Sequence, residues 1–345
     1  MNFQIAILLG QDGIINGAIY ALLALSIILV FTVTRILLIP LGEFVTFGAL
    51  TMYAFQSGHE INIAWLLLAM MLIDAALDAR RLLINGMDNR KMQLAGIKVA
   101  YALMMVVLIE TLDLQEIPMA VQAALTLMLL VPLGPIIYRL FFQPIASAQP
   151  LVLLIVSIAL HVAMVGMGLL LFGPEGGRTA PFTASGFSLG PVMLKSQTLW
   201  VIVVSITLIV ALFLAFERTL YGKALRATAV NRMGARLMGI SPDFAGKATF
   251  ALAAFIGVAS GILIAPITTL YYDSGFIISL KGFVGAIIGG LISYPLAAIG
   301  AVGVGLIEAF SMFWASDYKE IIVFTLIIPF LIWRSLNSNH VEDEE

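Results

Sequence analysis

Uninterrupted apolar segments constrain this chain more than any other feature of its sequence. The first extends from residue 4 to residue 33 with Asp12 as its only charged side chain, and similar segments recur along the chain. A segment of ~20 apolar residues is long enough to cross the hydrocarbon core of a bilayer as one helix. The segments are continuous and do not alternate with polar residues as the wall of a β-barrel does. The sequence therefore predicts an all-α fold, a polytopic transmembrane helical bundle.

The composition excludes the other broad classes of protein. Of the 345 residues, 61% are hydrophobic and 11% are charged, whereas soluble domains are about half apolar and about a quarter charged. Such a chain cannot cover a water-facing surface, which excludes a soluble enzyme, a disordered chain and a nucleic-acid binder. It contains no cysteine, and its three histidines lie far apart. We therefore expect no disulfide, no metal site and no cofactor in this chain.

Charged residues, prolines and glycines divide the chain into about 8–11 spans. The predicted spans cover residues 4–33, 36–56, 61–77, 97–110, 117–137, 151–172, 199–216, 247–270, 282–294, 296–314 and 320–334. We expect one transmembrane domain over residues 1–335. The acidic tail at 336–345 is expected to be disordered.

Basic residues predict the orientation of these spans. With eleven spans and the N terminus outside, 14 of the 18 basic residues fall on the cytoplasmic side, and only Arg178, Lys195, Lys281 and Lys319 fall outside. An excess of lysine and arginine is typical of cytoplasmic loops. The C terminus is then cytoplasmic. So are a basic loop at 78–98 and a longer loop at 217–246, whereas the loop at 173–198 is periplasmic.

The loop at 217–246 has the composition of an amphipathic helix over residues 223–238. Four apolar residues recur at steps of four and four basic residues occupy the other faces. The apolar positions are Leu225, Ala229, Met233 and Leu237, and the basic positions are Lys223, Arg226, Arg232 and Arg236. Gly239 ends this helix, and Ser241 caps the next one. Such a helix either docks on a cytoplasmic partner or lies on anionic lipid, and the composition alone favours lipid.

Charged residues inside apolar segments are candidates for a solute translocation path. Glu43 and Glu308 each lie within a predicted span, where either could pair with the ammonium group of a solute. The structural alternative for Glu43 is a position near the inner interface, hydrated or bound to its helix, and for Glu308 it is a buried hydrogen-bond partner. His161 is expected to make a hydrogen bond between helices. Gly285 and Gly289 form a small-xxx-small pair. They predict either close helix packing or a broken helix beside the translocation path.

No phosphate-binding loop of the form G-x-x-x-x-G-K-[ST] occurs in the sequence. A transporter built on this chain must therefore draw its energy from a gradient or from another subunit. We expect no catalytic residue here.

Several segments, taken in order, resemble the permeases of branched-chain amino acid ABC transporters. These are residues 13–22 with 42–44, residues 138–139 with 143–145 and 171–176, residues 217–227 with 235–240, and residues 282–290 with Gly300 and Glu308. Residues 217–246 resemble the cytoplasmic coupling loop of that family. The resemblance implies an ATPase-coupling role for Lys223, Arg226, Arg232, Met233, Arg236 and Leu237.

The resemblance implies that this chain is a permease subunit of a bacterial inner-membrane ABC importer for branched-chain or related amino acids. Its partners would be ATP-binding subunits, a second permease subunit, a periplasmic solute-binding protein and the lipid bilayer. Two alternatives stay open: a urea, amide or simple-sugar permease of the same superfamily, and a stand-alone secondary transporter or channel. An integral-membrane enzyme is disfavoured, because no paired catalytic residues recur across the spans.

Overall fold

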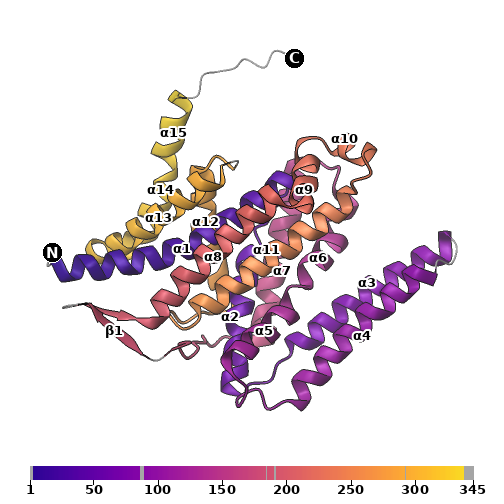
Figure 1. Cartoon of the computed structure of the whole chain (residues 1–345), viewed down its shortest axis with the longest axis horizontal. Helices are drawn as coiled ribbons and strands as arrows, with labels where there is room; N and C mark the ends of the chain where they lie inside the picture. The colour runs from indigo at the N-terminus through magenta and orange to yellow at the C-terminus, as the bar shows by residue number, and fades with distance from the viewer. Residues whose placement is uncertain (1–2, 86–88, 184, 190–191, 292, 338–345) are drawn as a thin grey trace.

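The computed structural model describes residues 3–85, 89–183, 185–189, 192–291 and 293–337 as a bundle of α-helices (Figure 1). The helices are α1 (Phe3–Thr34), α2 (Leu41–Ser57), α3 (Ile63–Asn85), α4 (Asn89–Thr111), α5 (Met119–Leu130), α6 (Leu133–Ile137), α7 (Pro150–Phe172), α8 (Ser196–Arg218), α9 (Leu220–Val230), α10 (Arg232–Leu237), α11 (Pro242–Ile264), α12 (Ser274–Ile288), α13 (Tyr294–Trp314), α14 (Lys319–Thr325) and α15 (Ile327–Asn337). Three short helical turns complete the helical structure: the π-helical η1 (Tyr138–Phe142) and the 3₁₀ turns η2 (Gln143–Ile145) and η3 (Ser316–Tyr318). The predicted all-α fold class is confirmed.

Seven helices in the described part of the chain are long and apolar enough to cross a membrane. They cover Gln4–Thr34, Met92–Thr111, Met119–Ile145, Pro150–Phe172, Ser196–Arg218, Pro242–Ile264 and Tyr294–Trp314. Each of the other four predicted spans is helical but is not both long enough and apolar enough to be counted among these seven. Helices α2 and α12 are short, with 17 and 15 residues, α3 carries several charges, and the span at 320–334 is divided between α14 and α15.

Helices α1, α2, α11, α12 and α13 form the centre of the bundle. Helix α1 packs against α11, α12 and α13, and α2 packs against α11 and α12. Helix α2 is buried on every face along most of its length, whereas much of α8 is exposed. The α3–α4 hairpin lies at the side of the bundle, at the lower right of Figure 1. The central helices are therefore the place to look for buried polar side chains.

Proline and glycine set the limits of α7. Pro150 occupies the first turn, where its missing N–H costs no hydrogen bond. At the other end Gly173 has φ of 79°, a conformation that side chains with a Cβ rarely adopt. These residues limit α7 to 23 residues, the length of one membrane crossing.

Two predicted boundaries are wrong, and one predicted loop contains strands. Residues 78–98 do not form a basic loop: most of them extend α3 and α4, which are joined through residues 86–88, outside the described residues. The predicted loop at 173–198 contains an antiparallel hairpin, β1 (Gly186–Leu189) paired with β2 (Val192–Lys195). The predicted span at 282–294 is displaced, because α12 begins at Ser274 and ends at Ile288. The tail at 338–345 lies outside the described residues.

The β1–β2 hairpin and the α9–α10 segment lie at opposite ends of α8 (Figure 1). At the hairpin end, Gln11 of α1 donates a hydrogen bond to Thr198, and Gly177 pairs with Leu270 in an isolated bridge. We refer to these as the β1–β2 end and the α9–α10 end. The segments predicted to be periplasmic and cytoplasmic, 173–198 and 217–246, therefore occupy opposite ends of the bundle.

Candidate functional site

Glu43, which is buried, and His161, which is partly exposed, form a pair between α2 and α7. Glu43 lies in the first turn of α2, where the free N–H groups of the helix terminus favour a carboxylate. His161 is the central residue of α7, and its Nδ1 lies 2.8 Å from Glu43 Oε1. The Phe276 ring of α12 stacks on the imidazole at 4.5 Å between centroids. The predicted interhelical hydrogen bond of His161 is confirmed.

The second carboxylate oxygen of Glu43 has no hydrogen-bond partner among the described residues. Glu43 Oε2 is buried, and so is Thr46 Oγ1, which lies about one turn further along α2 and also lacks a partner. Buried polar atoms are nearly always hydrogen-bonded, so two such atoms on one short stretch of helix require an explanation. A polar solute or water molecule that reaches this position would satisfy them.

Glu308 has a different environment, because both of its oxygens are occupied. Lys281 Nζ of α12 lies 2.5 Å from Glu308 Oε1, and the Tyr20 hydroxyl of α1 donates to Oε2 at 2.6 Å. All three side chains are buried. The structural alternative for Glu308, a buried hydrogen-bond partner, therefore describes its surroundings. The predicted spans counted Lys281 among the basic residues of the outer side, whereas it is the central residue of α12, which starts earlier than predicted.

A third buried cluster joins the α3–α4 hairpin to the rest of the bundle. Arg139 of η1 forms ion pairs with Asp74 and Asp78 of α3, at 2.7 Å for the Arg139 Nη1–Asp74 Oδ1 pair. Lys98 of α4 contacts the same two carboxylates, at 2.7 Å for Asp74. Sequence reasoning missed this cluster. Its signal was the spacing of Asp74 and Asp78, which places two acids on one face of a helix.

Residues 217–246, which we call the coupling segment after their predicted role, contain two helices, α9 and α10, rather than the single helix predicted over residues 223–238. Asn231 interrupts it with extended backbone, and its side chain accepts a hydrogen bond from Gly234 N at 2.9 Å to cap α10. Asparagine favours this position because its side chain replaces a missing backbone acceptor. Two predicted helix ends are confirmed. Gly239, with φ of 81°, follows the end of α10, and Ser241 caps α11 by accepting a hydrogen bond from Phe244 N.

The break at Asn231 separates the predicted apolar face into two parts. Leu225 is buried in a small cluster with residues of α1, α8 and α11, and Ala229 packs against it. Met233 and Leu237 are exposed, at 69% and 82%. The apolar stripe therefore serves two surfaces: α9 packs on the bundle, and α10 presents its apolar side chains outward.

The basic residues of the coupling segment divide in the same way. Lys223 and Arg236 are exposed. Arg226 Nη1 contacts Glu217 Oε1 at 2.7 Å. Arg232 donates to Thr34 O at 2.6 Å and to Ala146 O at 3.0 Å, at the end of α1 and just after η2. Carbonyl groups at a helix C-terminus attract a cation. Arg232 thus fastens α10 to the transmembrane helices.

Gly285 and Gly289 lie where α12 contacts α13. A Cβ at Gly285 would lie 2.6 Å from Ala301 Cβ, and one at Gly289 would lie 2.6 Å from Ala297 Cβ. The close-packing alternative describes this geometry. After Gly289 the chain turns through Gly290 and Leu291, which have φ of 67° and 57°, and α13 begins at Tyr294. The predicted break between these two helices is therefore present.

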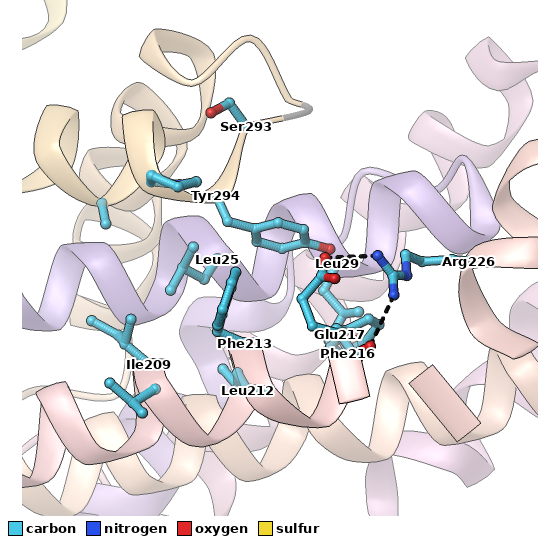
Figure 2. Close-up of a pocket in the computed structure, with 13 residues that line it drawn as sticks. Leu25, Leu29, Ile209, Leu212, Phe213, Phe216, Glu217, Arg226, Ser293 and Tyr294 are labelled. Carbon is cyan, nitrogen blue, oxygen red and sulfur yellow. Dashed lines mark hydrogen bonds and ion pairs between the residues drawn. The ribbon is translucent and has the colours of Figure 1, made fainter. Parts of the chain in front are cut away.

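A pocket of about 420 Å³ lies beside the coupling segment, between α1, α8 and α13 (Figure 2). Its walls are mostly apolar, and Glu217 and Arg226 stand at one end. Across the described residues, no group of three or more acidic or histidine side chains is arranged to hold a metal ion.

The apolar helices and the ion pairs between them are those of a multi-pass membrane protein. The α9–α10 segment lies at one end of its helical bundle. The chain belongs to the family described as "Branched-chain amino acid transport system / permease component", whose sequence model matches residues 94–331. This confirms the resemblance drawn from the sequence.

Individual members of the family are distant relatives of this chain. It is 26% identical over 206 residues to the "High-affinity branched-chain amino acid transport system permease protein LivH" of Salmonella typhimurium, covering 57% of this chain and 66% of the relative. LivH of Escherichia coli is 26% identical over 211 residues, with the same coverage of both chains. The permease protein BraD of Pseudomonas aeruginosa is 24% identical over 243 residues, covering 68% and 79%. No solved structure gives a significant match.

Proposed function

We propose that this chain is the permease subunit of an ABC importer in the bacterial inner membrane, where it carries branched-chain or related amino acids inward. The observation that supports this best is the α9–α10 segment, which presents exposed Met233 and Leu237 and is fastened to α1 through Arg232. Relatives named as branched-chain amino acid permeases support the solute class.

In this proposal the partner ATPases hydrolyse ATP and move the coupling segment. Exposed apolar side chains of α10, flanked by Lys223 and Arg236, would form the docking surface. Arg232 would transmit the movement to the end of α1, because its hydrogen bonds join α10 to that helix. A shift between outward-open and inward-open states requires the ATPase to bind one state more tightly than the other.

Glu43 is our candidate for contact with the solute. It lies beside the midpoint of α7, is fully buried, and has one carboxylate oxygen without a partner among the residues that the structure describes. A carboxylate is the natural partner of the ammonium group that every amino acid carries, and Phe276 offers an aromatic face nearby. We assign Glu308 a structural role, because Lys281 and Tyr20 already occupy both of its oxygens. Gly285 and Gly289 would allow α12 and α13 to slide past each other.

The remaining partners follow from the proposed orientation. With the N terminus outside and the C terminus in the cytoplasm, the β1–β2 end would receive solute from a periplasmic binding protein, at the loop 173–198. A second permease subunit would complete the pathway. The exposed apolar faces of α7 and α8 provide surface for that subunit or for lipid.

Purification from the native membrane tests this proposal. An ATPase and a second permease chain should co-purify with the tagged chain. The reconstituted complex should take up amino acid only when ATP and a binding protein are present. Uptake by the chain alone, driven by a proton gradient, would instead support the second candidate, a secondary transporter. The Glu43–His161 pair favours that candidate, because ionisable residues within membrane helices are typical of ion and proton pathways.

A further inference from the structure

The pocket between α1, α8 and α13 has one charged end and a long apolar interior. Leu25 and Leu29 of α1, Ile209 and Phe213 of α8, and Ala298 of α13 line the apolar part. At the charged end, Arg226 contacts Glu217, and Figure 2 shows the Tyr294 ring extending toward this pair. This polarity matches a molecule with an apolar chain and a polar head.

The pocket opens sideways along α8. Val210 and Phe213, which form part of its wall, are 49% and 55% exposed. They belong to a helix that is apolar enough to cross the membrane, and most of its surface is not covered by the rest of the chain. A ligand could therefore enter from the bilayer without passing through water.

The charged end of the pocket holds one basic and one acidic side chain, Arg226 and Glu217. Two further basic residues, Arg218 and Lys223, lie between these two in the sequence. Arg226 is 43% exposed at its side chain, and its guanidinium has five N–H donors, so its contact with Glu217 leaves donors for a second acceptor. Basic pockets between transmembrane helices bind anionic lipid headgroups.

We propose that this pocket binds an acyl chain of an anionic phospholipid, with the lipid phosphate held at Arg226. The acyl chain lies along Phe213 and Ala298, and the headgroup rests against α9. This goes beyond the transport function, because α9 begins the coupling segment and the bound lipid would adjoin it. A second permease chain covering the same groove is the competing occupant.

Photo-crosslinking on the full-length chain tests the proposal. The chain is placed in phosphatidylcholine vesicles that contain phosphatidylglycerol with a photoactivatable acyl chain, and crosslinked peptides are identified by mass spectrometry. We expect crosslinks on the pocket segments of α8 and α13, displaced by unlabelled phosphatidylglycerol more effectively than by phosphatidylcholine. Val162 of α7, 63% exposed, reports ordinary bilayer lipid and should show no headgroup preference.

Two substitutions with opposite expected effects on the lipid preference distinguish a lipid site from a structural ion pair. Arg226→Gln should lower the preference for the anionic lipid about fivefold, the equivalent of ~1 kcal/mol for one basic residue near the surface. Glu217→Gln should raise it, because Arg226 then has no competing carboxylate. Arg80→Gln removes the same charge from an exposed position of α3, outside the pocket, and should leave the preference unchanged.

Ala298→Phe should block crosslinking in the pocket and spare α7, which also reports that the variant is folded. The proposal is wrong if both headgroups compete equally. It is also wrong if pocket crosslinks are absent while α7 is labelled, the result expected for a groove occupied by protein. Arg226→Gln and Glu217→Gln changing the preference in the same direction would contradict it as well.

Discussion

Lys281 Nζ and Glu308 Oε1 lie 2.5 Å apart although the two residues are 27 positions apart in the sequence. With the Tyr20 hydroxyl on the other oxygen of Glu308, the contact joins α1, α12 and α13 at one point. In this buried position each charged group compensates the charge of the other. Replacing one member of the pair should therefore have a very different effect on stability from replacing both.

Lys281→Met should destabilise the protein strongly, because it leaves the Glu308 carboxylate buried without its cation. Breaking a buried ion pair on one side typically costs ~3–5 kcal/mol, whereas replacing both partners by apolar residues is close to neutral. The double variant Lys281→Met with Glu308→Leu should therefore recover most of the loss. Thermal unfolding in detergent measures both, and a double variant no more stable than Lys281→Met would refute the pairing argument.

Glu43→Gln should reduce amino-acid uptake about tenfold or more while the protein reaches the membrane at its normal level. The amide preserves the size of the side chain and its hydrogen bond to His161 but removes the negative charge, and hydrogen bonds to charged groups contribute ~1.5–3 kcal/mol. Uptake by the reconstituted complex gives the apparent KM and the maximal rate. The matched control is Glu110→Gln on the exposed side of α4. Unchanged uptake by the Glu43 variant would remove this residue from the translocation path.

Met233→Ser combined with Leu237→Ser should weaken ATPase association without lowering the stability of the permease. Both side chains are exposed, so their loss removes a docking surface and no internal contact. Co-purification of the ATPase measures the association. Tyr271→Ser, at the β1–β2 end and 48% exposed, should have no effect. Normal co-purification of the double variant would place the docking surface elsewhere.

Arg232→Gln should retain the ATPase but reduce the uptake obtained for each ATP hydrolysed. The arginine bonds to carbonyl groups at the end of α1 and after η2, so its loss loosens the connection between α10 and the membrane helices. The ratio of uptake to ATP hydrolysis in vesicles separates this outcome from loss of docking. A variant that lost ATPase binding together with uptake would assign Arg232 to the docking surface instead.

Asn231→Ala should destabilise α10 by about 1 kcal/mol, the usual effect of losing an N-cap side chain. Asn231→Asp keeps an acceptor for Gly234 N and should preserve the helix. Amide hydrogen exchange over residues 232–237 reports the difference directly. Equal exchange in the two variants would show that packing, rather than the cap, holds α10.

Arg139→Met should free the α3–α4 hairpin from the bundle, because Asp74 is buried and depends on Arg139 and Lys98 for its compensating charge. The expected loss is ~3–5 kcal/mol, as for other broken buried pairs. Lys98→Met should cost less, since the lysine side chain is 36% exposed and exposed pairs contribute little. Hydrogen exchange along α3 compares the two variants, and equal effects would contradict the ranking.

Local sequence signals predicted the helices and several of their ends. Pro150 and Gly173 limit α7, and Ser241 caps α11, as their backbone preferences require. The same signals failed where one residue has two compatible roles. Asn231 fits a helix interior in a periodic pattern, yet its side chain also caps α10, and a helix pattern over 223–238 does not distinguish these conformations.

The charged residues show where sequence reasoning reached its limit. Glu43 and Glu308 were equivalent candidates in the sequence, because each is an acid within an apolar segment. Their surroundings in the structure differ: Glu43 Oε2 has no partner in the described part of the chain, whereas Lys281 and Tyr20 occupy both oxygens of Glu308. Counting the basic residues on each side of the membrane also gave no sign that Arg139 and Lys281 are ion-pair partners of acidic residues inside the bundle.

The sequence by itself determined that this chain is a membrane-embedded helical bundle of the branched-chain amino acid permease family. Apolar segment length and turn residues act locally, and they are readable without knowing which helices touch. Only the tertiary structure decided which charges meet, since Glu43 pairs with a residue 118 positions away and Tyr20 with one 288 positions away. Such contacts depend on how whole helices pack, and in an apolar environment that packing decides whether a buried charge is held by the protein or left for a ligand.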